Sequence, residues 1–382
     1  MANNNDNKVL NVPPLRFPEF SGEWKMCTIG ELITKVGSGV TPRGGEAVYK
    51  TEGHPFVRSQ NVGLGNLLLD DIAFIDEETH LRQKNTELQF NDVLLNITGA
   101  SIGRSALVDK QIVGGNVNQH VCIIRTKENL VPSFICSFLL SNYGQRQIDS
   151  FQAGGNRQGL NFEQIKSIKI TIPSKDEQIK IAKLLRAIDE RIATQNKIIE
   201  KLQSLIKGIA QNVARNNKPN IRLSECLECS SSTLQESDVC KNGTYPVYGA
   251  NGIVGYLDNY NTEKEAVYII KDSSGVGTVS YVTGKCSATG TLNTLQAKEG
   301  YSLQYLYYML KVFNFEPYKT GMAIPHIYFK DYGKAKIFCP SYTEQLKYAR
   351  LLSAIDNKLS AEQSILTDLS LQKQYLLRQM FI

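Results

Sequence analysis

Residues 173–189 read PSKDEQIKIAKLLRAID, and residues 340–356 read PSYTEQLKYARLLSAID. The two stretches align without a gap and share Pro-Ser, Glu-Gln, Leu-Leu and Ala-Ile-Asp at matching places. Each stretch follows a longer segment that is much less similar to its counterpart. The chain therefore alternates variable segment, helix, variable segment and helix. This pattern predicts a tandem duplication and suggests a protein that recognises a two-part target.

Both repeated stretches are predicted to begin long amphipathic helices. Ser174 precedes Glu177 by three residues, as Ser341 precedes Glu344, which is the spacing of a capping box. Apolar residues then recur in steps of four and three over about forty residues, a heptad seam roughly 60 Å long. The seam positions are Ile181, Leu185, Ile188, Ile192, Ile199, Leu202 and Ile206 in the first helix, and Leu352, Ile355, Leu359, Leu366 and Leu369 in the second.

A seam of this length needs a partner, and two similar seams in one chain are most simply each other's partner. We expect an intramolecular antiparallel coiled coil, because that arrangement relates the two half-chains by a pseudo-two-fold axis. Gln195 and Glu362 interrupt the two seams at matching positions and would help to set the register. The alternative is that each helix packs only against the domain that precedes it.

The variable segments share a skeleton of strand, Gly-rich turn and strand. Residues 92–97 lead into a turn at 98–104, and residues 266–270 lead into a turn at 271–277. A short helix follows in each segment. The predicted fold class is α+β, with two globular α/β domains separated by the two long helices. The predicted division is a tail at 1–20, a first domain at 21–172, a helix at 173–216, a second domain at 217–339 and a helix at 340–382.

The composition is that of an ordinary globular protein, with 42% hydrophobic and 21% charged residues. A formal net charge of +6 permits contact with nucleic acid but does not require it. The 8 cysteines are too sparse for a disulfide scaffold, so reduced thiols are expected. No apolar run approaches the roughly 18 residues of a membrane span. The polar start lacks the apolar core of a signal peptide, so we expect a cytoplasmic protein.

Motifs of catalysis are missing from the sequence. Gly284-Lys285-Cys286 lacks the hydroxyl residue and the earlier glycine of a phosphate-binding loop, and no Asn-Pro-Pro-aromatic motif of an amino-methyltransferase occurs. The 4 histidines lie apart in the sequence, without metal-ligand spacing. Cys226 and Cys229 have the spacing of a zinc knuckle, but no second pair completes a site. We therefore expect no catalytic centre, no metal and no cofactor in this chain.

Four groups of residues, in this order, resemble one family. The first is Pro14-Leu15-Arg16-Phe17-Pro18-Glu19-Phe20 with Gly22-Glu23-Trp24, and the second is Gly99-Ala100-Ser101-Ile102-Gly103. The third is Tyr245-Pro246-Val247-Tyr248-Gly249-Ala250-Asn251-Gly252-Ile253, and the fourth is the repeated helix start at Pro173 and Pro340. Over nearly its whole length the chain resembles the specificity subunit of type I restriction-modification systems.

The resemblance implies two target-recognition domains, each of which reads one half of a split sequence in double-stranded DNA, held at a fixed spacing by the coiled coil. Two methyltransferase subunits would dock on the helices and carry the S-adenosylmethionine chemistry. Two motor-nuclease subunits, which use ATP, would be able to join them. The subunit itself would not be an enzyme. Two other hypotheses stay open: a coiled-coil scaffold that binds only protein, and an enzyme with an unrecognised site, which the missing motifs disfavour.

Polar side chains at loop tips are the candidates for DNA contact, because base edges are read by hydrogen-bonding side chains and phosphates by lysine and arginine. In the first domain the candidates are Thr41, Arg43, Arg58, Gln60, Asn61, Arg104, Asn156, Arg157 and Gln158. In the second domain they are Tyr248, Asn251, Lys271, Ser273, Ser274, Lys285, Thr320 and His326.

Overall fold

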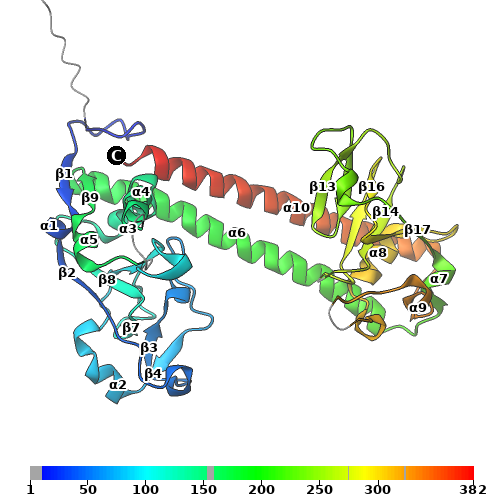
Figure 1. The fold of residues 1–382 in the computed structure, drawn as a ribbon, viewed down its shortest axis with the longest axis horizontal. Helices are drawn as coiled ribbons and strands as arrows, with labels where there is room; N and C mark the ends of the chain where they lie inside the picture. The colour runs from blue at the N-terminus through cyan, green and yellow to red at the C-terminus, as the bar shows by residue number, and fades with distance from the viewer. Residues whose placement is uncertain (1–10, 153–158, 274, 322–323) are drawn as a thin grey trace, which may run out of the picture. The chain divides into compact units, whose positions relative to one another are not determined.

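The computed structural model describes residues 11–152, 159–273, 275–321 and 324–382. The chain divides into two units, one made of residues up to Gln195 together with Ile365–Ile382, and one made of Asn196–Ser364. Unit 1 and unit 2 each combine a globular domain with one part of each long helix (Figure 1). Both long helices therefore pass from one unit into the other.

The globular domain of unit 1 is built on two sheets. Its strands are β1 (Lys25–Thr28), β2 (Ile33–Ser38), β3 (His54–Val57), β4 (Ala73–Ile75), β5 (Val93–Asn96), β6 (Ser105–Leu107), β7 (Asn116–Val117), β8 (Val121–Thr126) and β9 (Lys169–Ile172). The larger sheet has the order β2-β8-β5-β6, and all its neighbours are antiparallel. The smaller sheet has the order β4-β3-β7, with β3 parallel to β7. Strands β1 and β9 form a separate antiparallel pair that leads into the first long helix.

Strand β5 and the first four residues of β8 are fully buried, because both faces of the larger sheet are covered. Val93 and Leu95 of β5 point into one hydrophobic core, while Leu94 between them points into a second core. The residues of β8 divide between the same two cores in the same alternating way. The two cores therefore share one wall, which explains why these strands are apolar throughout instead of alternating with polar residues.

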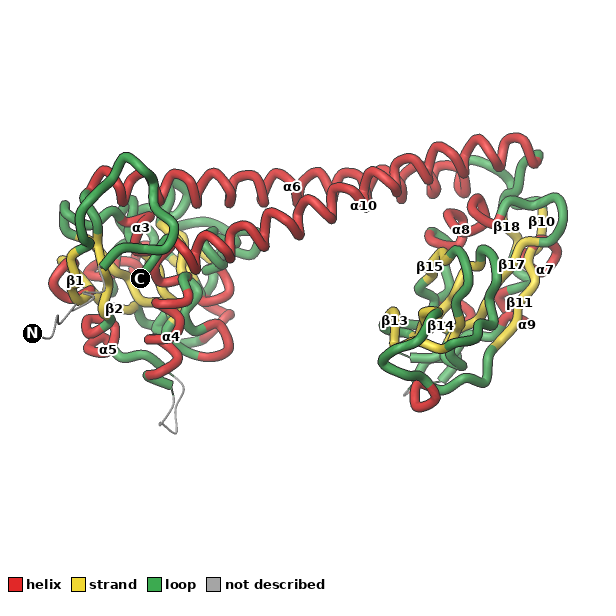
Figure 2. Tube along the Cα trace, turned by 90° about the horizontal axis from the view of Figure 1, so that it is seen from above, coloured by secondary structure: helices red, strands yellow, loops and turns green. Residues whose placement is uncertain are grey.

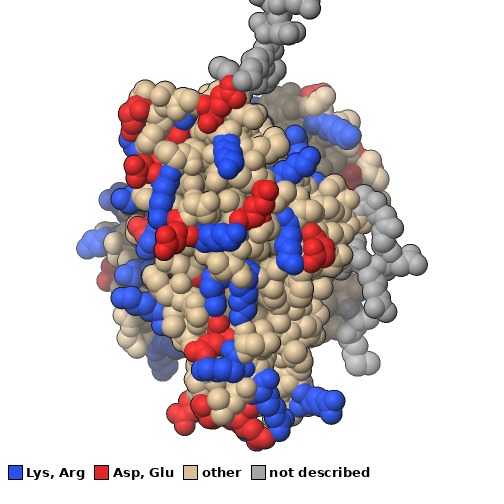
Figure 3. All heavy atoms as spheres, turned by 90° about the vertical axis from the view of Figure 1, so that its left-hand side faces the viewer, with Lys and Arg blue, Asp and Glu red and all other residues tan. Residues whose placement is uncertain are grey.

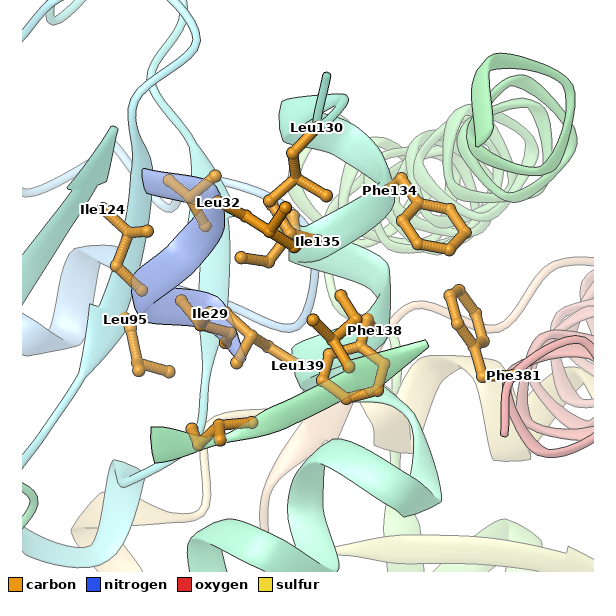
Figure 4. Packing of buried hydrophobic residues seen from close by; sticks show 14 of the residues in the cluster. Ile29, Leu32, Leu95, Ile124, Leu130, Phe134, Ile135, Phe138, Leu139 and Phe381 are labelled. Carbon is orange, nitrogen blue, oxygen red and sulfur yellow. The ribbon is translucent and has the colours of Figure 1, made fainter. Parts of the chain in front are cut away.

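The first core of unit 1 lies between the larger sheet and every short helix of the domain except the second, Glu77–Arg82, which contributes no residue to it. The helices are α1 (Ile29–Leu32), α2 (Glu77–Arg82), α3 (Pro132–Leu140), α4 (Asn142–Ser150) and α5 (Phe162–Ser167), with 3-10 turns at Gly45–Val48, Ser59–Asn61, Lys84–Thr86 and Gly99–Ser101. Figure 4 shows apolar residues of α1 and α3 packed toward Leu95 and Ile124 of the sheet. Phe381, which follows the end of the second long helix, joins this core, and its ring centroid lies 5.2 Å from that of Phe134.

Unit 2 repeats this plan. Its strands are β10 (Ile221–Arg222), β11 (Leu227–Ser231), β12 (Tyr245–Gly249), β13 (Gly252–Leu257), β14 (Ala266–Ile270), β15 (Val279–Val282), β16 (Ser287–Ala288), β17 (Leu292–Ala297) and β18 (Lys336–Ile337). Its helices are α7 (Leu223–Cys226), α8 (Leu303–Lys311) and α9 (Phe329–Tyr332), with 3-10 turns at Glu236–Asp238 and Glu316–Tyr318. The sheets have the orders β11-β17-β14-β15, β13-β12-β16 and β10-β18, and β12 is parallel to β16. This is the arrangement of unit 1 strand for strand, so the predicted tandem duplication is confirmed.

Two long helices follow the globular domains: α6 (Lys175–Arg215) and α10 (Tyr342–Gln379). Each begins directly after its predicted cap serine. Every predicted seam position is buried or half-buried, from Ile181 in α6 to Leu369 in α10. The polar seam residues Gln195 and Glu362 are buried as well. The heptad pattern in the sequence therefore identified the face of each helix that is removed from solvent.

The two helices pair in opposite directions. In unit 1 the start of α6 packs beside the end of α10, where Leu185 shares the first core with Leu376. In unit 2 the end of α6 lies beside the start of α10, where Ile206 and Leu359 line one groove. The pairing is therefore antiparallel within each unit, as the colour gradient along α6 and α10 shows (Figure 1), and the predicted fold class is confirmed; the same two helices are seen from above in Figure 2.

One residue of the repeat fastens each helix to its domain. Gln178 Oε1 accepts a hydrogen bond from the backbone N–H of Val131 at 2.9 Å, and its Nε2 donates to the carbonyl of the proline that precedes α6 at 3.1 Å. At the matching position of unit 2, Gln345 Oε1 accepts from Ser302 N–H at 2.9 Å, and its Nε2 donates to the proline carbonyl before α10 at 2.9 Å. Since both amides are buried, these bonds satisfy groups that would be costly to leave unpaired.

The two matching glutamates differ, and each helix forms one half of the predicted capping box: Ser174 Oγ accepts from Glu177 N–H at 3.4 Å in α6, and Glu344 accepts from Ser341 N–H at 3.3 Å in α10. Glu344 stays local, and its carboxylate accepts from the hydroxyl of its cap serine at 2.8 Å. Glu177 is 1% exposed and instead accepts from Arg16, from Nε at 2.7 Å and from Nη2 at 2.8 Å. This bidentate pair raises the pKa of the Arg16 guanidinium above its ordinary value. Beside it, Leu15 N–H donates to the Gln379 carbonyl at 3.0 Å, so one short segment contacts both long helices.

Replacement of Arg16 by alanine should lower the free energy of unfolding of unit 1 by about 3 kcal/mol, because it leaves the Glu177 carboxylate buried without its partner. Urea unfolding followed by circular dichroism measures this loss. Lys180→Ala is the matched control, because Lys180 pairs with Glu19 in the same region and both side chains are 46% exposed. Such a pair contributes at most about 1 kcal/mol. Equal losses in the two variants would contradict the prediction.

Candidate nucleic-acid interface

In unit 1 several loops meet at one end of the larger sheet. Strands β2 and β5 run in the same direction, because each is antiparallel to β8 between them. Their last residues, Ser38 and Asn96, therefore lie at the same end as the start of β8, and the Asn96 side chain donates to the Ser59 carbonyl at 2.8 Å. The loop edge of unit 1 is defined by residues 39–43, 58–61, 97–104 and 118–120. It contains every first-domain candidate that the structure describes.

Four side chains of this loop edge form one hydrogen-bonded chain. The backbone N–H of Thr41 donates to Gln119 Oε1 at 3.0 Å, so the NH₂ group of the same amide faces His120. That amide nitrogen lies 3.0 Å from His120 Nε2, and since it only donates, the ring nitrogen accepts. The neutral ring then carries its proton on Nδ1, 2.5 Å from Thr98 Oγ1. The Thr98 hydroxyl hydrogen stays available to a ligand.

Gln119 and His120 are functional candidates that the sequence analysis missed. They lie directly before the buried strand β8, but the residues they contact are far from them in sequence. The sequence signal for these two residues is that a pair of polar residues stands directly before a buried strand. It becomes informative only when the strand order shows which loops lie beside it.

The candidates at residues 58–61 bind within the domain. Arg58 donates through Nη2 to the carbonyl of Asp71 at 2.6 Å, and its guanidinium lies 5.5 Å from the centroid of the Tyr49 ring. Gln60 is exposed and donates to the Asp71 carboxylate. Asn61 is completely buried, and its amide donates to Asp71 Oδ1 at 2.9 Å. The prediction that Asn61 is an exposed contact residue is wrong, because its side chain holds the turn together.

Arg43 and Arg104 are exposed at the loop edge of unit 1. The turn before Arg104 depends on Gly103, whose φ is +84° and whose Cα faces the amide of Gln145. A Cβ at Gly103 would approach Gln145 Oε1 to 2.7 Å, so the turn needs glycine here. Gln145 Nε2 donates to the Gly103 carbonyl at 3.1 Å and fixes the turn to α4. The candidates Asn156, Arg157 and Gln158 lie outside the described residues.

Unit 2 has a loop edge at the equivalent end of its larger sheet, made of residues 271–273, 289–291, 320–321 and 324–327. Lys271 and Ser273 follow β14, and Asp272 forms a β-bridge with His326. His326 and Thr320 also exchange backbone hydrogen bonds at 2.9 and 2.7 Å. The structure therefore brings these predicted residues together from two distant loops. Ser274 lies outside the described residues.

The remaining second-domain candidates belong to the smaller sheet. Tyr248 lies in β12 with its ring centroid 5.7 Å from that of Tyr268, and Asn251 is exposed in the turn that follows β12. Lys285 precedes β16, and its ammonium lies 4.7 Å from the centroid of the Tyr260 ring. A hydrogen bond to Tyr260 raises the pKa of Lys285. These side chains offer a cation and hydroxyl groups that are able to contact a polyanion.

Charge is not gathered in one place on the described surface of unit 1 that Figure 3 presents. Lysine and arginine side chains are interspersed there with aspartate and glutamate. The net charge of +6 therefore does not produce a single basic patch on this face.

The part of the chain that the structure describes contains neither a cluster suited to a metal ion nor a helix able to cross a membrane. There, no group of three or more histidine, cysteine, aspartate or glutamate side chains is arranged to hold a metal ion. Cys226 ends α7 in the core, and burial raises the pKa of its thiol to about 12. Cys229 lies apart on β11, and Cys240 is exposed. Within the same residues, no helix has both the length and the apolar character needed to cross a membrane.

Relatives of known class resemble this chain in sequence. "Putative type I specificity subunit" of Mycoplasma genitalium is 25% identical over 320 residues, which span 76% of this chain and 81% of that protein. The specificity subunit of the type I restriction enzyme EcoKI of Escherichia coli K12 is 22% identical over 202 residues, 50% of this chain and 41% of that protein. The shorter match to EcoKI covers less than half of that protein's length.

Solved structures show the same fold. The type I restriction-modification S subunit from M. genitalium superposes with a TM-score of 0.66 at 19% identity, over 97% of this chain and 99% of that one. A chain from a study of complex assembly and conformational transition of a type I system gives a TM-score of 0.53 at 16% identity, over 93% and 96%. The family model "Type I restriction modification DNA specificity domain" matches residues 21–204 and 219–370. Since these two matches cover most of both halves, the chain belongs to the family of type I restriction-modification specificity subunits.

Proposed function

We propose that the chain is the sequence-specific DNA-recognition subunit of a type I restriction-modification complex, with each globular domain reading one half of a two-part target. The observation that carries this proposal is the pair of loop edges. They stand at equivalent ends of duplicated sheets but carry different polar side chains. The family match over both halves supports the same reading.

The polar side chains at the two loop edges are the groups proposed to read the DNA sequence. In unit 1, hydrogen bonds to His120 hold the side chains of Thr98 and Gln119, so their hydrogen-bonding groups are oriented before DNA arrives. Arg104 is exposed beside them and suits a phosphate or a guanine edge. In unit 2 the corresponding side chains include Thr320 and His326, whose backbones exchange two hydrogen bonds. Because the two sets differ, we propose that the half-sites differ and that the target is asymmetric.

The helices are proposed to set the distance between the half-sites. Helices α6 and α10 are each continuous from one unit to the other, and their seam residues are buried or half-buried. A paired helix bends little, so its length determines how far apart its two ends lie. Readers placed about one turn of DNA apart, roughly 34 Å, are able to engage the same face of a duplex.

Methyltransferase subunits are the proposed protein partners, one for each unit. In unit 1 a groove of about 360 Å³ lies between the end of α3 and α10, where Leu371 and Tyr375 are 57% and 55% exposed. In unit 2 a groove of about 480 Å³ lies between the end of α8 and the long helices, lined by Ala210 and Leu359. Since α8 repeats α3, the grooves occupy equivalent positions, which suits two copies of one partner.

In this proposal the partner subunits carry the catalytic activities. The chain is proposed to be non-catalytic, with S-adenosylmethionine bound by the methyltransferase subunits and ATP by motor-nuclease subunits that join the complex. The relatives' names as specificity subunits support a recognition role. We propose that the complex acts in the cytoplasm, where it would meet DNA.

Exchange of residues 21–172 for the same segment of a relative tests the two-reader proposal. We expect only one half of the methylated sequence to change, because each domain carries its own loop edge. Single-molecule mapping of methylated bases in the source genome, with the native and the exchanged chain, gives the result. A change in both halves, or methylation that does not depend on this chain, would sink the proposal.

Insertion of one heptad after Gln195 and another after Glu362 tests the spacer. Both helices would lengthen by roughly 10 Å while the seam keeps its register. The gap between half-sites should therefore widen by about three base pairs, at roughly 3.4 Å each, with the half-sites unchanged. The matched control is a heptad inserted into α6 alone, which mispairs the seam and should abolish activity. Unchanged spacing in an active double-insertion complex would rule out the helices as the ruler.

Gln119→Leu tests the hydrogen-bonded chain of unit 1. The variant loses the acceptor for Thr41 and the donor to His120, so the Thr41 amide should exchange with solvent about fivefold faster, the equivalent of one hydrogen bond. Discrimination in one half-site should fall as well, while the other half stays intact. Gln111→Leu is the control, because Gln111 is exposed outside the loop edge. Normal discrimination by Gln119→Leu would remove this network from the readout.

A further inference from the structure

The loop edge of unit 2 is hollowed by a polar cleft of about 510 Å³. Strands β11 and β17 supply Ser231 and Asn293 to its lining, the loop after β14 supplies Lys271, and the segment before α9 supplies His326. Lys330 on α9 also lines the cleft. The cleft thus combines side chains from both loops that the Asp272–His326 bridge brings together.

The lining of this cleft is held in place before any ligand binds. The backbone of Lys271 is fixed on both sides, since its N–H donates to Thr291 at 3.0 Å and its carbonyl accepts from Ile327 at 2.9 Å. Asn293 is buried, and its amide oxygen accepts from Ser231 Oγ at 2.9 Å. A preorganised lining reduces the entropy that binding has to overcome.

The charge of the cleft favours an anion. Lys271 and Lys330 face one acid, Asp272, which leaves a net charge of +1 when His326 is neutral. The Cys229 thiol adds no negative charge at neutral pH, because burial raises its pKa to about 11. The Lys330 ammonium lies 5.3 Å from the centroid of the exposed Tyr328 ring, which limits the positions of this long side chain.

Unit 1 differs at the equivalent position. Leu160 N–H donates to Ile97 as Ile327 N–H donates to Lys271, so Ile97 is the counterpart of Lys271. Ile97 is 5% exposed and apolar. The β-bridge from Thr98 to Gly159 likewise matches the bridge from Asp272 to His326. The lysine at the floor of the cleft is therefore a feature of the second domain and not of the shared skeleton.

We propose that this cleft receives one phosphate of the DNA backbone, held by Lys271 and Lys330, and the proposal rests on the DNA-recognition function proposed above. A hollow suits a phosphate because phosphates project from the duplex, whereas base edges lie on the groove floor and are reached by protruding groups. The contact would anchor unit 2 on its half-site independently of sequence. Unit 1 would have to orient itself through other contacts.

The test measures binding of a random-sequence DNA duplex to the full chain in its methyltransferase complex over a range of salt concentrations. Lys271→Gln and Lys330→Gln should each weaken binding about fivefold and lower the slope of log K against log salt, and the double variant should lower that slope by about 0.9, the value for one phosphate. Lys336→Gln, an exposed lysine on β18, is the matched control and should change neither quantity. Lys271→Arg should retain the slope, which separates loss of charge from misfolding.

Other results would overturn the inference. An unchanged slope in both lysine variants, with selective DNA binding by the native complex intact, would remove the phosphate contact while leaving the proposed function standing. Loss of base preference in one half-site at a constant slope would identify Lys271 as a base reader instead. Inorganic phosphate serves as a second probe: stabilisation of the native chain but not of Lys271→Gln, together with an unchanged salt slope for DNA, would point to a free anion as the ligand. A native complex without any DNA binding would reject both the inference and the function.

Discussion

The antiparallel seam between α6 and α10 is the contact on which the rest of the structure depends. A helix of about forty residues with one apolar face is stabilised mainly by burial of that face and only weakly by its own propensity. In each unit the globular domain is fastened to this pair, through Gln178 in one and Gln345 in the other. The first core of unit 1 is completed by Leu376 of α10 and by Phe381, which follows that helix. Helix pairing and domain folding therefore stabilise each other.

Much of the scaffold was predictable from sequence because its signals are local and periodic. A serine after proline marked the start of each long helix, and steps of three and four residues identified the buried face. The pairing of Glu177 with Arg16 was not predictable. It joins residues 161 positions apart, and the equivalent Glu344 binds its own cap instead. No local pattern distinguishes these two glutamates.

The interface was less accessible to sequence reasoning for a physical reason. Loops contain the same types of polar residue whether the side chains contact a ligand or form the hydrogen bonds of a turn. Thr41 and Arg104 were predicted and do lie at the loop edge of unit 1, but Asn61 is a buried turn residue. Gln119 and His120 were missed because their importance comes from contacts with Thr41 and Thr98. Only the strand order brings those loops together.

Strands β5 and β8 separate the two cores of unit 1. This arrangement has a consequence for how the domain unfolds. Leu94 packs into one core and Val93 and Leu95 into the other, so neither core is able to separate from the sheet without exposing part of its neighbour. Unfolding of one core alone would therefore require nearly as much free energy as unfolding of both cores. The sheet should behave as a single cooperative block, and the mobility needed to fit a ligand is confined to the loops at its end.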